Sequence, residues 1–184
     1  MKTVSISAIL ITALISSQVL AQPAALRVAP QALSSMTNAS RQALGKAGLA
    51  NAAVTGTISL TVAAPKSQGA SLGFTGASQI VTAQGYAQFP ANPMNGESSW
   101  ADVNFNAAAA TAYIVDCGIS GVTTASMGVQ IGTSSVSPTI TTPVDGHVSV
   151  LVPSQAAGGS RHVMVAGRGG NGWRTTGCTI RTVK

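Results

Sequence analysis

Few side chains in this sequence could carry acid–base chemistry. The supply consists of two histidines, His147 and His162, and four acids, Glu97, Asp102, Asp116 and Asp145. A glycosidase needs two carboxylates at a set separation, and a serine hydrolase needs a histidine beside its nucleophile with an acid behind it. Nothing in the sequence favours one pair of acids over another. We predict no catalytic residue and expect a non-catalytic protein, with a secreted hydrolase as the third alternative.

The two histidines are expected to lie on one hairpin. Residues 147–152 and 161–166 both read as short strands, and pairing them places Leu151 opposite His162. His147 then lies on the same face as Leu151 but four residues away, or about 13 Å along the strand. On this arrangement the histidines cannot share a metal ion or relay a proton. We interpret His147 as a polar residue that flanks a turn.

One short motif imitates the start of a calcium loop. Asp102, Asn104 and Asn106 alternate as in such loops, but Ala107 stands where the turn glycine belongs and Tyr113 replaces the closing glutamate. In a strand, these three polar side chains would instead share the solvent-facing side. The sequence therefore predicts neither a metal ion nor any other cofactor.

The segment from Gly167 to Arg174 is the most suggestive candidate for a binding surface. Its glycines free the backbone, and Arg168 and Arg174 flank Trp173 in the sequence. An exposed indole there would stack on a sugar ring, while the two guanidinium groups would hold an anionic group. The alternative is a glycine-rich loop that leads into a strand whose first residue, Trp173, covers the core.

Aromatic residues make up only 4% of the chain, so few are available outside the core. Tyr86, Phe89 and Trp100 form a second possible aromatic group around the loop at 90–96. The scarcity weakens a carbohydrate-binding interpretation without removing it.

Cys117 and Cys178 are the only cysteines and are predicted to form a disulfide. The bridge would close a loop of about 60 residues and stabilise the fold by about 4 kcal/mol in the chain-entropy model. No CxxC motif points to redox chemistry. We expect a structural link between two strands or sheets.

From Val54 onward, apolar and polar residues alternate, which is typical of half-buried strands. About nine or ten short strands without a long helix predict an all-β fold, an antiparallel β-sandwich of Greek-key or jelly-roll type. The clearest segments are 57–62, 98–106, 111–117, 122–131, 135–141, 147–152, 161–166 and 173–183, with shorter ones between 71 and 89.

The first 21 residues have the three-part layout of a secretory signal: a positive start, an apolar stretch and small residues before Gln22. Residues 22–53 are predicted to be a linker or a loosely ordered N-terminal arm. A short helix through Lys46 is expected there, capped by Asn38 or Ser40 and broken by Gly45 and Gly48. Residues 54–184 would then form the sandwich domain.

Charged residues make up only 8% of the chain, and the net charge of +6 comes from scattered lysines and arginines. Nucleic-acid binding needs a clustered basic surface, so we expect none. No second apolar stretch approaches membrane length, so no membrane span is expected after signal removal. The sequence favours a secreted, periplasmic or surface protein with a structural or adhesive role. The partner expected for this role is a second copy of the chain or a molecule at the surface. A soluble module that binds glycans or anionic polymers is the alternative.

Overall fold

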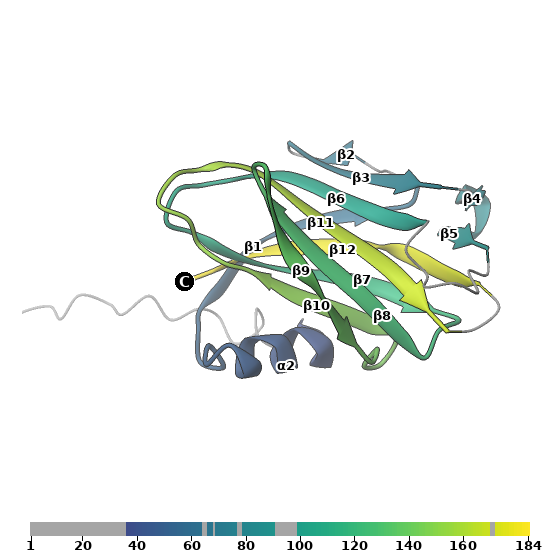
Figure 1. The fold of residues 1–184 in the computed structure, drawn as a ribbon, viewed down its shortest axis with the longest axis horizontal. Coiled ribbons are helices and arrows are strands. Elements are labelled where there is room, and N and C mark those ends of the chain that lie inside the picture. Colours follow the sequence, from purple (N-terminus) through teal and green to yellow (C-terminus); the bar gives the residue numbers. More distant parts are fainter. Residues whose placement is uncertain (1–35, 64–65, 68, 77–78, 91–98, 170–171) are drawn as a thin grey trace, which may run out of the picture.

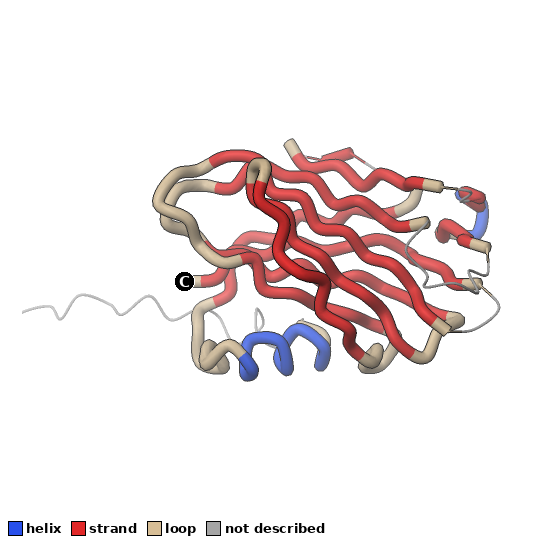
Figure 2. Tube along the Cα trace, in the orientation of Figure 1, coloured by secondary structure: helices blue, strands red, loops and turns tan. Residues whose placement is uncertain are grey.

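Two antiparallel sheets stacked face to face form the body of the protein, a β-sandwich (Figure 1 and Figure 2). The structure is a computed structural model that describes residues 36–63, 66–67, 69–76, 79–90, 99–169 and 172–184. Sheet A contains β1 (Val54–Thr61), β4 (Gln79–Val81), β5 (Tyr86–Phe89), β7 (Ala112–Ser120), β10 (His147–Val152) and β12 (Trp173–Val183). Sheet B contains β2 (Lys66–Ser67), β3 (Ala70–Thr75), β6 (Trp100–Ala107), β8 (Thr124–Ile131), β9 (Ser134–Thr141) and β11 (Gly159–Arg168).

The strand order mixes segments that are distant in sequence. Sheet A runs β10-β7-β12-β5-β4, with β1 also paired to β12, and sheet B runs β2-β3-β6-β11-β8-β9. The predicted sandwich is therefore confirmed. The described residues form more strands than expected because β2 and β4 are two and three residues long, too short to give an alternating pattern.

The core lies between the sheets and follows from the alternation of each strand. In β6 every second residue is buried, from Ala101 through Val103 and Phe105 to Ala107. The inward side chains of sheet A meet this layer, and they include Leu60, Phe89, Val115 and Ile180. Because side chains alternate across a strand, the polar residues between the buried ones lie on the outer face of each sheet.

The expected hairpin of residues 147–152 with 161–166 is wrong. β10 pairs with β7 in sheet A, and β11 pairs with β6 and β8 in sheet B. The chain therefore crosses from one sheet to the other between these strands, and His162 lies opposite Asn104 and Gln130, not opposite Leu151. Sequence adjacency favours a hairpin, but this crossing lets both strands cover the same core from opposite sides.

A bulge in β12 lies between the part of this long strand that pairs with β5 and the part that pairs with β1. Its register shifts between Thr175 and Gly177, so Trp173 and Cys178 both face the core although five residues separate them. Gly177 has a φ of 129°, and a Cβ there would come 2.1 Å from the carbonyl oxygen of Leu60. Only glycine therefore allows β1 and β12 to approach this closely.

One helix, α2 (Asn38–Lys46), packs on the outer face of sheet A, and a 3₁₀ turn, η1 (Thr82–Gln84), joins β4 to β5. The predicted helix is confirmed, but its N-cap is Thr37 and not Asn38 or Ser40. Gly45 lies inside the helix, and Gly48 follows its end with a φ of 73°.

A second, smaller apolar cluster joins α2 to the sheet. It contains Met36, Leu44, Val54, Ile114 and Val183. The register of β1 shifts between Thr55 and Thr57, which turns Val54 toward this cluster while Leu60 faces the main core. Residues 22–35 lie outside the described residues, and the domain boundary at residue 53 stays a prediction.

The predicted disulfide is confirmed between Cys117 and Cys178. The two residues lie directly opposite each other on β7 and β12, with their Cα atoms 4.1 Å apart. The bridge therefore joins neighbouring strands of one sheet at a sequence separation of 61. It supports the centre of sheet A, because β7 and β12 lie inside that sheet.

Candidate functional site

The outer face of sheet B carries an aspartate–histidine pair that the sequence did not predict. The Nε2–H of His162 on β11 donates to Oδ1 of Asp102 on β6 at 2.5 Å. The hydroxyl of Thr75 donates to the other carboxylate oxygen at 2.8 Å. Gln130 Oε1 lies 3.3 Å from Nδ1 of His162, so four strands of the sheet contribute to one polar group.

The same face extends from an aromatic end to a polar end along β6. Trp100, Asp102 and Asn104 are all partly exposed and lie on this side of the strand, as their alternation predicted. Four residues separate Trp100 from Asn104, which is about 13 Å along the strand. The face therefore offers an indole ring and hydrogen-bonding side chains in one row.

Two hollows lie on this face. The first, of about 180 Å³, is lined at the aromatic end by Trp100, Ser126, Gly128, Pro138, Met164 and Ala166. The second, of about 440 Å³, is lined by Lys66, Ser71, Asn104, Asn106, Ser160 and neighbouring residues. The first presents mainly apolar surface and the second is bordered by amides, hydroxyls and one ammonium group, so the face is graded from apolar to polar.

A second aspartate–histidine pair lies on the outer face of sheet A. Asp116 on β7 is only 7% exposed, and its Oδ1 accepts from the Nδ1–H of His147 on β10 at 2.7 Å. Its Oδ2 accepts from Thr37 at 2.5 Å, from Ser40 at 2.9 Å and from the hydroxyl of Ser149. One carboxylate therefore joins the start of α2 to two strands.

The hydroxyl groups around Asp116 are arranged for support and not for nucleophilic attack. In a serine hydrolase the nucleophile bonds the histidine, which bonds the acid in turn. Here Ser40 and Ser149 bond the carboxylate of Asp116 itself and each other at 3.1 Å. A carboxylate that accepts several charge-assisted hydrogen bonds is a strong anchor. The interpretation of His147 as a turn-flanking residue thus missed its partner.

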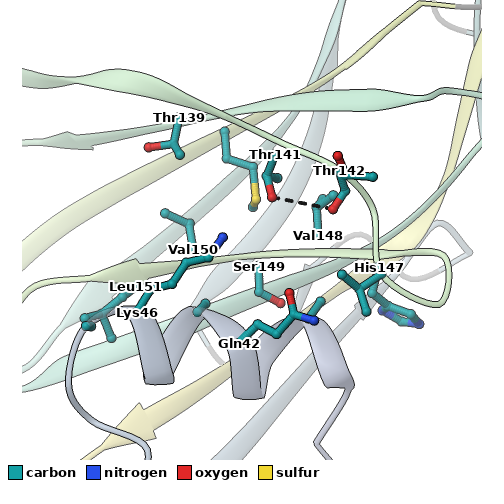
Figure 3. Close-up of a pocket in the computed structure, with 15 residues that line it drawn as sticks. Gln42, Lys46, Thr139, Thr141, Thr142, His147, Val148, Ser149, Val150 and Leu151 are labelled. Atoms are coloured by element: carbon teal, nitrogen blue, oxygen red, sulfur yellow. Dashed lines mark hydrogen bonds between the residues drawn. The ribbon is translucent and has the colours of Figure 1, made fainter.

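A groove of about 290 Å³ lies beside this network, between α2, β10 and residues 139–144 (Figure 3). Figure 3 shows Lys46 of α2 reaching toward Val150, with threonine side chains across the groove and His147 at one end. Lys46 and His147 are the titratable side chains among its lining residues, and most of the others are apolar or threonine.

The candidate segment around Trp173 does not present an exposed indole for stacking. Trp173 is 3% exposed, and its ring stacks on Phe89 at 3.9 Å between centroids and 5° between planes. A Cβ on Gly167 would come 2.5 Å from Cγ of Trp173, so glycine permits this packing. The structure matches the alternative interpretation, in which Trp173 covers the core. The expected exposed indole at Trp173 is not found, because the ring is buried.

The two arginines of that segment have different surroundings. Arg174 places its guanidinium 4.6 Å from the ring centre of Tyr86 and donates from Nε to Gln88 at 2.5 Å. Arg168 is partly buried at the end of β11. Of the second aromatic group, Phe89 is fully buried, Tyr86 lies under Arg174, and Trp100 alone reaches a hollow. Anion binding by Arg168 and Arg174 stays a prediction.

Within the described residues, no group of three or more histidine, cysteine, aspartate or glutamate side chains is placed to hold a metal ion. No helix in the described part of the chain has the length and apolarity to cross a bilayer.

Comparison with known proteins gives distant structural likenesses only. No family model matches the chain, and no curated protein matches it. A mutant of a family 29 carbohydrate-binding module aligns with a TM-score of 0.44 and 12% identity over 72% of this chain and 93% of that chain. A family two carbohydrate esterase from Cellvibrio japonicus aligns with a TM-score of 0.42 and 12% identity over 72% of this chain. This chain spans 35% of the esterase, and at such TM-scores these likenesses carry no argument about what it does.

Proposed function

We propose that this protein is a secreted glycan-binding β-sandwich that binds through the outer face of sheet B. The observation that carries the proposal is the row formed by Trp100, Asp102 and Asn104, completed across the sheet by His162. Sugar rings have an apolar C–H face and a rim of hydroxyl groups. They are therefore held by an aromatic ring together with carboxylate, amide and imidazole groups, which is what this row offers.

The shape of the face supports the same proposal. The hollow beside Trp100 has room for one side of a sugar ring at about 180 Å³, and the polar hollow at Asn104 lies further along the same strand. Two of these four side chains are held in place before any ligand arrives, because Asp102 is hydrogen-bonded to Thr75 and His162. A prearranged polar group loses less conformational entropy on binding than a free one.

The disulfide supports an oxidising compartment, because such bonds persist in secreted proteins and are rare in the cytosol. An adhesive role at a cell surface or in a matrix is part of the proposal, since glycan binding is itself a means of attachment. Signal-peptide cleavage after Ala21 and self-assembly remain proposals that rest on the sequence.

The test is binding of the mature protein to a panel of neutral oligosaccharides, followed by calorimetric titration of the best ligand. Trp100→Ala should weaken binding at least tenfold, because a stacked aromatic ring commonly dominates such a contact. Ile140→Ala is the matched control, since Ile140 is 58% exposed on β9 of the same sheet and does not line either hollow. Unchanged affinity in Trp100→Ala, or a panel without any ligand, would overturn the proposal.

A further inference from the structure

Arg161 is buried at the end of the core, and no carboxylate of the described residues bonds to it. It is 3% exposed and lies on the same side of β11 as Val163 and Val165, which face the other sheet. Nη1 donates to the carbonyl of Ser160 at 3.0 Å, and Nη2 donates to that of Ala157 at 3.1 Å. Nε is buried and has no hydrogen-bond partner in the described part of the chain.

The three described aspartates are hydrogen-bonded to residues other than Arg161. Asp102 bonds His162, Asp116 bonds His147, and Asp145 accepts from Asn38 at 2.6 Å. The fourth acid of the sequence, Glu97, lies outside the described residues. Two neutral carbonyl groups therefore surround a full positive charge at Arg161, and they use two of its five N–H groups.

A buried guanidinium has no way to discharge itself. Arginine stays protonated in proteins where a lysine or histidine would lose its proton. Leaving such a charge unpaired in the interior costs free energy that a bound anion would offset. A carboxylate matches the planar guanidinium best, because it accepts two parallel hydrogen bonds.

The neighbourhood of Arg161 has room for such a group. A groove of about 360 Å³ runs between the β8–β9 turn and the loop before β11, and Arg161 is one of its lining residues. The loop contributes the small residues Ala156, Ala157 and Gly158 there, together with Gln155, and Gly159 at the start of β11 also lines the groove. None of the lining residues of the groove is acidic.

The groove borders the proposed glycan surface at one residue, Ser160. Ser160 lines both this groove and the polar hollow of sheet B, where Lys66 supplies a second positive charge. We propose that the groove at Arg161 binds the carboxylate of a uronic acid residue, so that the ligand of this protein is an acidic glycan. The choice of a sugar over a peptide carboxylate rests on the proposed function, through this shared border.

The experiment measures the thermal midpoint of the mature protein against increasing galacturonate, with galactose at equal concentration and inorganic phosphate at equal ionic strength. At ten times the dissociation constant, galacturonate should raise the midpoint by roughly 3–6 °C. Galactose should give a smaller shift, and phosphate should give none. A phosphate shift as large as that of galacturonate would reassign the groove to anions in general. A larger shift with a peptide carboxylate would reassign it to a protein partner.

Arg161→Met removes the charge and keeps the length of the side chain. It should abolish the galacturonate shift and leave the ligand-free midpoint equal or higher, because an unpaired buried charge is removed. A fall in the ligand-free midpoint with the galacturonate shift retained would show that Arg161 only supports the loop. Arg161→Lys keeps the charge but loses the planar fork, and it should weaken galacturonate binding at least tenfold.

A second variant keeps the test decisive if Arg161→Met fails to fold. Ala156 is exposed and lines the groove, so Ala156→Glu supplies an internal carboxylate in place of the ligand. It should raise the ligand-free midpoint and abolish the galacturonate shift, while Ala156→Gln, of equal size, should keep the shift. Glu97→Gln tests for an internal partner: a loss of midpoint that disappears in the Arg161→Met background would overturn the proposal.

These experiments distinguish a failure of the acidic-sugar proposal from a failure of the proposed glycan site on sheet B. Binding of neutral oligosaccharides that survives in Arg161→Met, together with no effect of galacturonate on the wild type, would remove the acidic-sugar proposal alone. A galacturonate shift that depends on Arg161, with no change in Trp100→Ala and no neutral ligand, would remove the sheet B face as the glycan site.

Discussion

The outer faces of the two sheets carry the same pair of residues in two different surroundings. On sheet A, Asp116 is buried beneath α2 and accepts from hydroxyl groups as well as from His147. On sheet B, Asp102 bonds His162 and Thr75 and stays partly open to solvent. No helix of the described chain contacts sheet B as α2 contacts β7 and β10.

This difference shows that an aspartate–histidine pair has no role of its own. At Asp116 the hydrogen bonds come from the start of α2 and from β10, and the result is a link between a helix and a sheet. At Asp102 the pair lies beside an indole and two hollows, and the result is a polar surface that a ligand can reach. The covering helix therefore distinguishes the pair at Asp116 from the pair at Asp102, which belongs to the proposed glycan site.

The disulfide should give the largest difference between the sheets. Replacing Cys117 and Cys178 by alanine removes the link between β7 and β12 and should lower the free energy of unfolding by about 4 kcal/mol. Urea unfolding measures this loss. We expect the folded double variant to bind oligosaccharides as the wild type does, because sheet B contains neither cysteine. A loss below about 1 kcal/mol would show that sheet A does not depend on the bridge.

Asp116→Ala should have the next largest effect. It leaves three hydroxyl groups and one imidazole without their shared acceptor, at a cost of about 2–4 kcal/mol in the free energy of unfolding. Amide hydrogen exchange should show faster opening of α2 than of sheet B. The matched control is Asp116→Asn, which keeps one carbonyl acceptor and should lose less. Equal protection of α2 in Asp116→Ala and the wild type would separate the helix from this network.

Asp102→Ala should have the smallest effect on stability, about 1 kcal/mol, because His162 retains Gln130 and gains water as partners. Its effect on glycan affinity should be larger in proportion, at several-fold, and calorimetric titration measures it. The comparison between the faces would break if Asp102→Ala destabilised the protein as much as Asp116→Ala, or if it left glycan affinity unchanged.

The strands, the disulfide and the outward side of β6 could be predicted from the sequence because each depends on local alternation or on a forced pairing. β10 and β12 begin and end where the pattern placed them. The partner of each strand could not be predicted in this way. Pairing depends on contacts between distant segments, and the hairpin rule failed where the chain crosses from β10 to β11.

The candidate sites depended on that pairing. Asp116 and His147 are 31 residues apart and meet only because β7 lies beside β10. Asp102 and His162 are 60 residues apart and meet only because β6 lies beside β11. No spacing rule in the sequence signals either meeting. Trp173 and Trp100 also looked alike in the sequence, and the stack on Phe89 decides which of them is buried.

The position of β12 has a consequence for when this protein can fold. Its residues 173–183 pair with β7 on one side and with β1 and β5 on the other. Sheet A therefore has no central strand until this segment has emerged from the ribosome. Non-local pairing of this kind is slow to form, so sheet A should stay incomplete until residues 173–183 have been synthesised.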